Sequence, residues 1–290
     1  MLEVVAVLLG SVVAGQAYVI NIDPAYASWP SGIVYYTIPP NEYSTAHMNI
    51  IKEAMQQLET DLGGSCIKFQ EFTRPAPPQG KYVVITHNGG LSGPGGQSCY
   101  TFPGMVASQT GQGQYMAMQD GQNGCLRDKK QAMRILASLL GLRSEHNKPA
   151  RDFAIRMNPQ FLDAVGRADN VFSTYDPTRV YASLQFDYNS ITMIDPITFS
   201  NGGFTYTVPN GVFLRNTGRL SLMDCQALQI MYACRTHVCT DHFPPFPLAT
   251  TTSRIPLTFD TFPTPSPTFF TTTRPTGPVG PSQRPTIDLR

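Results

Sequence analysis

Residues 134–146 read Arg134-Ile-Leu-Ala-Ser-Leu-Leu-Gly-Leu-Arg-Ser-Glu-His146 and form the most informative stretch of the chain. Between Asp128 and Leu142, apolar residues would cover most sides of a helix, and a helix of that kind is buried. Arg134 and Ser138 are four residues apart, which places them on one helical face. We therefore predict a buried helix over residues 128–142 that carries a cation and a hydroxyl on the same side.

Two further helices are predicted from periodicity and capping residues. Apolar residues recur at three- and four-residue steps from Thr45 until Gly63-Gly64 ends the pattern. Ser221, with Asp224 three residues later, is a helix start signal before another apolar run. The apolar positions of the first of these helices are Met48, Ile51, Met55, Leu58 and Leu62.

Strand patterns accompany these helices. They cover Cys66–Phe72 and Lys81–Thr86. The glycine-rich segment 89–96 is followed by neither a helix start nor Lys-Ser/Thr, so it is predicted to be an ordinary loop. Residues 29–239 therefore read as a mixed α and β domain.

The N-terminus has the form of a secretion signal. An apolar run from Val4 to Ala14 precedes Gly15-Gln16-Ala17, with small residues at both specificity positions of a cleavage site. The run is shorter than the ~20 apolar residues that span a bilayer, although a membrane anchor or a buried strand is the alternative. We predict a signal peptide at residues 1–17, an N-terminal segment at 18–28, and a secreted chain without a membrane span.

Charge and cysteine content narrow the class of protein. Charged residues make up 14% of the chain and the net charge is +1, so no basic patch points to nucleic acid. An even number of cysteines in an exported chain favours three disulfides, and their spacing alone leaves the pairing open. The cysteines are Cys66, Cys99, Cys125, Cys225, Cys234 and Cys239.

Residues 240–290 are rich in proline and threonine. Proline removes backbone donors and the segment has no hydrophobic period, so a packed core is not expected there. We predict a disordered tail, either plain or extended and O-glycosylated.

Several stretches resemble, in order and at similar spacing, segments of one known family. They are Trp29–Ile38, Ser-Cys-Ile-Lys-Phe at 65–69, Asn-Gly-Cys at 123–125, the run from Glu145 to Asn158, Phe-Asp-Tyr-Asn-Ser-Ile at 186–191, and Leu220–Tyr232 followed by Cys234. Together they resemble the astacin family, secreted metzincin zinc endopeptidases, over about residues 29–234. The resemblance implies an α+β, two-subdomain metzincin fold, with a mixed sheet and helices followed by an irregular C-terminal subdomain.

The family's zinc motif, His-Glu-x-x-His-x-x-Gly-x-x-His, falls on residues 134–144. Gly141 is kept, but Arg134, Ser138 and Ser144 stand at the three zinc-binding histidines and Ile135 stands at the general base. A guanidinium has no lone pair to donate, hydroxyls are poor zinc ligands beside imidazole, and an alkyl group cannot take a proton. On this resemblance the chain has no metal site, no cofactor and no catalytic residue.

The family's methionine turn is also changed. Length matching places Thr192 at the family's methionine, or Met193 if the register shifts by one, and Ile194 at its zinc-binding tyrosine. Zinc is expected only if distant residues supply a different ligand set, because no two histidines are spaced four apart. The histidines are His47, His87, His146, His237 and His242.

The same resemblance implies disulfide partners. It pairs Cys66 with Cys234 and Cys99 with Cys125, and Cys225 and Cys239 remain for each other.

Glu145 stands where the family's glutamate receives the ammonium group of the mature N-terminus. Our hypothesis is that signal cleavage makes Tyr18 such a terminus. The alternative is a salt bridge from Glu145 to Arg134 or Arg151.

The functional prediction is a secreted, catalytically inactive astacin-like protein with a binding or structural role toward an extracellular protein or peptide. Arg134 either has a carboxylate partner and fills space, or opens onto a cleft that holds a peptide carboxylate. The alternatives are an active zinc endopeptidase with a non-standard site, and a mucin-like matrix component that the folded domain anchors.

Overall fold

The computed structural model describes residues 18–72, 80–90, 99–108, 113–121, 123–212, 214, 218–235 and 239. The predicted signal peptide and the Pro/Thr-rich segment 240–290 lie outside the described residues, as do most of the glycine-rich segment and both His237 and His242. No helix in the described part of the chain is both long and apolar enough to cross a membrane.

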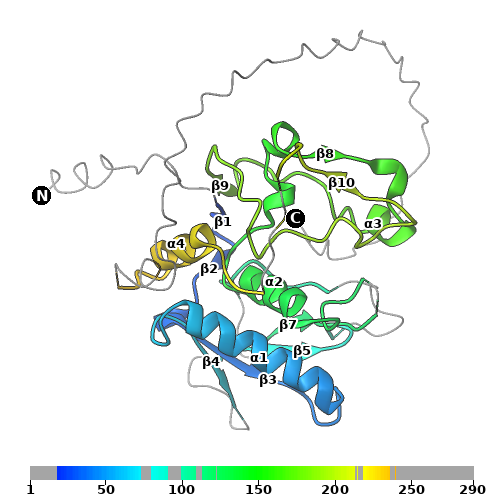
Figure 1. The fold of residues 1–290 in the computed structure, drawn as a ribbon. Coiled ribbons are helices and arrows are strands. Elements are labelled where there is room, and N and C mark those ends of the chain that lie inside the picture. Colours follow the sequence, from blue (N-terminus) through cyan, green and yellow to red (C-terminus); the bar gives the residue numbers. More distant parts are fainter. Residues whose placement is uncertain are drawn as a thin grey trace, which may run out of the picture. The chain divides into compact units, whose positions relative to one another are not determined.

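A four-stranded parallel sheet forms the first half of the domain (Figure 1). Its strand order is β4-β3-β5-β7, and Tyr36 of β3 is the register partner of both Glu71 of β4 and Val83 of β5. The predicted strands form, but they begin two residues later than the sequence patterns indicate. The bounds are β3 Ile33–Thr37, β4 Lys68–Glu71, β5 Val83–Thr86 and β7 Gln114–Ala117.

Helices α1 (Thr45–Asp61) and α2 (Lys129–Leu139) lie side by side and share the main buried core with this sheet (Figure 1). Each begins at a side-chain cap, because Ser44 accepts from the His47 amide and Asp128 accepts from the Gln131 amide. The prediction of a buried helix over residues 128–142 is confirmed in place and burial, with an earlier end.

The end of α2 is fixed by two aromatic donors. The Trp29 indole donates to the Leu139 carbonyl at 2.9 Å, and the Tyr232 hydroxyl donates to the Leu140 carbonyl at 2.9 Å. Gly141 then takes a φ of 104°, a conformation that side-chain-bearing residues rarely adopt. The helix therefore stops before residue 142 because its last carbonyls are satisfied from outside and the chain turns at Gly141.

The second half of the domain is largely irregular, as the family resemblance implies. Its small separate core contains Ile155, Phe172, Met193, Ile194, Phe199 and Tyr206.

The described part of the domain also has three short antiparallel strand pairs: β1 (Val19–Asn21) with β9 (Val180–Ala182), β2 (Tyr26–Ala27) with β6 (Met105–Val106), and β8 (Arg156–Met157) with β10 (Tyr206–Thr207). The remaining helices are α3 Ala164–Ala168, α4 Leu222–Met231 and the 3-10 turns η1 Pro30–Gly32, η2 Glu145–Asn147, η3 Arg151–Phe153 and η4 Pro159–Phe161.

Helix α4 begins where the sequence predicts. Ser221 and Asp224 form a reciprocal capping box, in which each side chain accepts from the other residue's backbone amide. Disulfides join Cys66 to Cys234, Cys99 to Cys125 and Cys225 to Cys239. These are the two pairs that the resemblance implies and the pair that remains.

Candidate functional site

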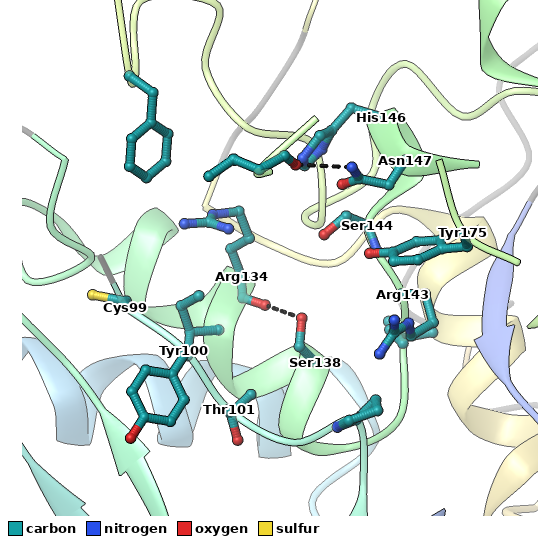
Figure 2. Close-up of a pocket in the computed structure, with 15 residues that line it drawn as sticks. Cys99, Tyr100, Thr101, Arg134, Ser138, Arg143, Ser144, His146, Asn147 and Tyr175 are labelled. Carbon is teal, nitrogen blue, oxygen red and sulfur yellow. Dashed lines mark hydrogen bonds between the residues drawn. The ribbon is translucent and has the colours of Figure 1, made fainter. Parts of the chain in front are cut away.

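A cavity of about 60 Å³ opens beside α2 (Figure 2). The structure brings four of the five degenerate positions to its wall: Arg134, Ile135, Ser138 and Ser144. Ile194 is not part of this wall and is buried in the smaller core.

Arg134 is the buried cation of this cavity, with 9% of its surface exposed. Its Nε donates to the Gln131 side-chain carbonyl at 3.1 Å, and no described carboxylate makes an ion pair with it. Asp195 is the nearby acid that partly offsets the loss of water, but Arg127, Lys130 and Gln131 already bind its carboxylate. Burial lowers the pKa of Arg134 to about 10. Of the two predicted arrangements for Arg134, the structure has the one that opens onto the cavity.

Arg143 adds a second positive charge to the cavity wall. Its guanidinium carbon lies 4.2 Å from the centre of the Tyr175 ring, and its Nε is buried without a hydrogen-bond partner. The Tyr175 hydroxyl accepts from the Ser144 amide at 3.0 Å, which fixes the ring under the guanidinium. No aspartate or glutamate is among the described residues that line the cavity.

The other lining positions offer little chemistry. The Ser138 hydroxyl donates to the Arg134 backbone carbonyl at 3.2 Å, within the helix (Figure 2). Ile135 presents only an alkyl group and is almost fully buried.

Among the described lining residues His146 is the one imidazole, and no role is predicted for it from the sequence. Its Nδ1 accepts from the Ile194 amide at 3.4 Å. Burial, reinforced by the charges of Arg134 and Arg151, lowers the pKa of His146 well below its ordinary value. The ring is therefore neutral at physiological pH. The sequence signal that could have placed His146 near this cavity is its position, shortly after Gly141 and directly after Glu145.

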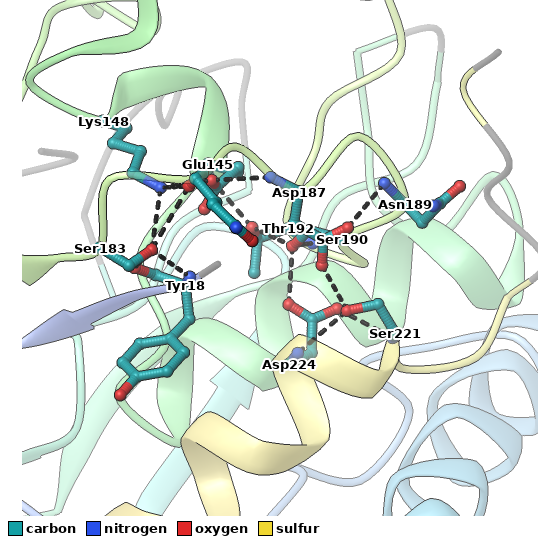
Figure 3. A network of polar contacts seen from close by, with 11 residues as sticks. Tyr18, Glu145, Lys148, Ser183, Asp187, Asn189, Ser190, Thr192, Ser221 and Asp224 are labelled. Carbon is teal, nitrogen blue, oxygen red and sulfur yellow. Dashed lines mark hydrogen bonds and ion pairs between the residues drawn. The ribbon is translucent and has the colours of Figure 1, made fainter. Parts of the chain in front are cut away.

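Glu145 lies in a buried polar network on the far side of this turn (Figure 3). Its carboxylate pairs with the Lys148 ammonium at 2.8 Å and accepts from the Asp187 amide at 3.0 Å. Burial raises the pKa of Glu145, and the Lys148 charge opposes that shift. The Tyr18 amide donates to the Ser183 hydroxyl at 2.9 Å, and that hydroxyl in turn lies 3.3 Å from the Lys148 ammonium.

The predicted salt bridge from Glu145 to Arg134 or Arg151 is wrong. Glu145 and Lys148 flank a single 3-10 turn, where side chains three residues apart eclipse one another and meet. Arg151 instead donates to the His146 carbonyl at 2.7 Å and pairs with Asp152. The Tyr18 amide binds Ser183, which contacts Lys148, and Lys148 in turn pairs with Glu145.

The network continues toward α4 through two further carboxylates, those of Asp187 and Asp224 (Figure 3). Asp224 accepts from the Ser190 hydroxyl at 2.7 Å and from the Ile191 amide at 2.6 Å. Burial, with a smaller contribution from Asp187, raises the pKa of Asp224 to about 7.

A group of potential metal ligands lies outside the cavity wall. His47, His87 and Asp120 place their ligand atoms within 4.8 Å of one another, and none of the three lines the cavity. These three residues are far apart in the sequence, so spacing alone does not identify them as one ligand set.

Comparison with known proteins identifies the family. The family model described as Astacin, a peptidase family, matches residues 21–233. The chain belongs to the astacin family. No match is found among curated protein sequences.

A solved structure shows the same fold as this astacin-family chain, and a second match is weaker. High choriolytic enzyme 1, a hatching-enzyme zinc protease from the medaka fish Oryzias latipes, is 22% identical over 72% of this chain and 94% of its own, with a TM-score of 0.52. Myroilysin is 17% identical over 71% of this chain and 82% of its own, with a TM-score of 0.44.

The cavity residues of this astacin do not fit a zinc ion. Zinc sites in proteins use imidazole, thiolate or carboxylate donors in a tetrahedral set. Among the described lining residues only His146 offers such a donor, because Cys99 is in a disulfide. The two guanidinium groups on this wall, with no described carboxylate beside them, would repel a cation.

Proposed function

We propose that this chain is a secreted astacin-family protein without peptidase activity, which binds an extracellular protein or peptide through the Arg134 cavity. The observation that carries the proposal is a pocket whose wall holds two arginines, one of them buried, and no described carboxylate. Secretion is supported by the three disulfides and by the signal-like N-terminus.

The ligand chemistry follows from charge and size. A buried cation is costly unless an anion or hydrogen-bond acceptors compensate it, and among the described residues Arg134 donates only to the Gln131 side-chain carbonyl. The volume of about 60 Å³ is several times the roughly 10–15 Å³ that one water molecule needs, so the cavity has room for a carboxylate. Guanidinium groups bind carboxylates in a planar, two-bond arrangement. The C-terminal carboxylate of a peptide is therefore the expected group.

The absence of proteolysis follows from the same wall. Without a bound metal no water has its pKa lowered toward 7, and without a base at position 135 a further factor of ~10²–10⁴ in rate is missing. The neutral His146 ring is engaged through Nδ1 and carries a strongly lowered pKa, so it is a weak base.

Peptide binding tests the proposal directly. Peptides of one sequence, with either a free or an amidated C-terminus, are titrated into the secreted protein by calorimetry. The free acid should bind about 10- to 100-fold more tightly, since a charged hydrogen bond contributes about 1.5–3 kcal/mol. Arg134→Met should remove that preference, and Arg156→Met, at an exposed arginine in β8, should keep it. Equal binding of the acid and the amide by the wild type contradicts anion recognition.

A second candidate is an active zinc endopeptidase with a non-standard site, favoured by the group of His47, His87 and Asp120. It predicts chelator-sensitive cleavage of casein, whereas the binding proposal predicts none with or without added zinc. Cleavage that disappears in His87→Ala would establish this candidate and reject the inactive protein.

A further inference from the structure

The group of His47, His87 and Asp120 lies at the point of the parallel sheet where the order of strand addition reverses, between β3 and β5. From β3 the chain passes through α1 to β4 on one side, and from β5 it continues to β7 on the other side. His47 is in the first turn of α1, His87 follows β5 directly, and Asp120 follows β7. The carboxyl ends of these parallel strands share one edge of the sheet, and such switch points are the usual ligand sites of open parallel sheets.

His87 is oriented by its neighbours. Its Nδ1 lies 3.5 Å from the Glu42 carboxylate, which also accepts from the His87 backbone amide at 2.6 Å. The Tyr43 ring is 4.4 Å from the imidazole, centre to centre. The Nδ1 side of the ring therefore faces the carboxylate, which matches the carboxylate–histidine pairs of zinc proteins, in which the other ring nitrogen binds the metal.

Asp120 is held beside His87 by the backbone. The Met118 amide donates to the Thr86 carbonyl at 3.0 Å, so the two strands stay paired up to the residues before the ligands. The Gln119 amide donates to the sulfur of Cys99 at 3.0 Å, in the disulfide with Cys125. The two residues before Asp120 are therefore anchored, while the Asp120 side chain is exposed.

We propose that His47, His87 and Asp120 bind one zinc-class divalent metal ion, with Glu42 as the positioning residue for His87. Two imidazoles and one carboxylate with an open fourth position are a known zinc ligand set. Bonds of about 2.0–2.1 Å place tetrahedral ligand atoms about 3.3 Å apart, so side-chain rotation has to shorten the present separations, which are all within 4.8 Å, by at most about 1.5 Å. The bound ion links the first turn of α1 to the ends of β5 and β7.

Zinc titration of the complete secreted chain tests this site. The protein is stripped with a chelator, dialysed and titrated with zinc sulfate alone by calorimetry, and Co²⁺ replaces zinc for visible spectroscopy. One ion should bind per chain, and Co²⁺ should give the strong visible bands of a tetrahedral site. Glu42→Gln should weaken binding by about 10- to 100-fold at unchanged stoichiometry. His47→Ala, His87→Ala and Asp120→Asn should each weaken it more than Glu42→Gln does.

Two controls keep the assignment specific. His242→Ala changes a histidine outside the described residues and should leave affinity and stoichiometry unchanged. Asp120→Asn alters an exposed side chain, so it separates lost ligation from lost folding, which circular dichroism checks for each variant. The proposal is overturned by a wild type that takes up no stoichiometric zinc, by binding that survives all three ligand substitutions, or by binding that His242→Ala abolishes.

Discussion

Replacing Lys148 with methionine should cause a large loss of stability, because it leaves the Glu145 carboxylate buried without its cation. Each side chain of this ion pair is only 2% exposed, and the two charges are 2.8 Å apart. After the substitution Glu145 keeps only the Asp187 amide, at 3.0 Å, as a donor to its carboxylate. Breaking a buried pair by removing one partner costs about 3–5 kcal/mol. For a domain of this size that loss lowers the melting temperature by roughly 6–20 °C.

Urea unfolding followed by fluorescence provides the measurement, because Trp29 is the only tryptophan and is buried beside α2. The double variant Glu145→Gln, Lys148→Met should recover much of the loss, since no unpaired charge remains. Lys52→Met is the matched control: Lys52 pairs with Glu71 at 3.3 Å on the surface, and such pairs contribute about 0–1 kcal/mol.

The pH dependence of the single variant adds an independent check. Burial already raises the pKa of Glu145 in the folded chain, and loss of the Lys148 cation removes an opposing effect. The folded state then holds a proton that the unfolded state releases, so the stability of Lys148→Met should increase as the pH is lowered. A loss of unfolding free energy below about 1 kcal/mol in Lys148→Met, or a double variant as unstable as the single one, contradicts a stabilising role for the buried Glu145–Lys148 pair.

Three further predictions concern the elements around the cavity. Because burial and Asp187 raise the pKa of Asp224 to about 7, its contribution to stability is full below its unfolded pKa of about 4 and is lost as the pH rises through about 7; melting curves of Asp224→Asn should therefore be flatter than the wild type across pH 4–7, and parallel curves contradict the assignment. Trp29→Phe removes a buried donor from the end of α2 and should cost about 1–3 kcal/mol in urea unfolding followed by circular dichroism, whereas an unchanged midpoint shows that the bond contributes nothing. Gly141→Ala should destabilise the fold by more than about 1 kcal/mol, because φ is 104° and the new carbon would lie 2.3 Å from the Met231 methyl group; a stable variant in the same assay rules out this constraint.

Local signals in the sequence predict much of the fold. The helix from Thr45, the buried helix at 128–142 and the capping box at Ser221 and Asp224 depend on residues within a few positions of one another. The end of α2 does not, since the two aromatic side chains that satisfy its last carbonyls come from residues 29 and 232. Sequence periodicity has no access to a hydrogen bond between segments so far apart.

The same limit applies to the site residues. The sequence places Arg134 at a former ligand position, but whether it finds an acid depends on Asp195, which three other side chains bind. His47 and His87 are neighbours because α1 follows β3 after a short connection and β5 lies next to β3. The pairing of Glu145 with Lys148 is different, because a local 3-10 turn brings the two residues together and the sequence spacing alone could have indicated it.

Helix α2 is stabilised without any metal ion, which explains how an astacin fold tolerates Arg134 and Ser138 on this face. Its first turn is capped by Asp128 and its last carbonyls by donors from Trp29 and Tyr232. The turn that follows is held by strand β1, where the Asn21 amide donates to the Gly141 carbonyl at 3.0 Å. None of these contacts uses a side chain at the former ligand positions. An anion site at these positions, as proposed, is therefore compatible with the support that the scaffold already has.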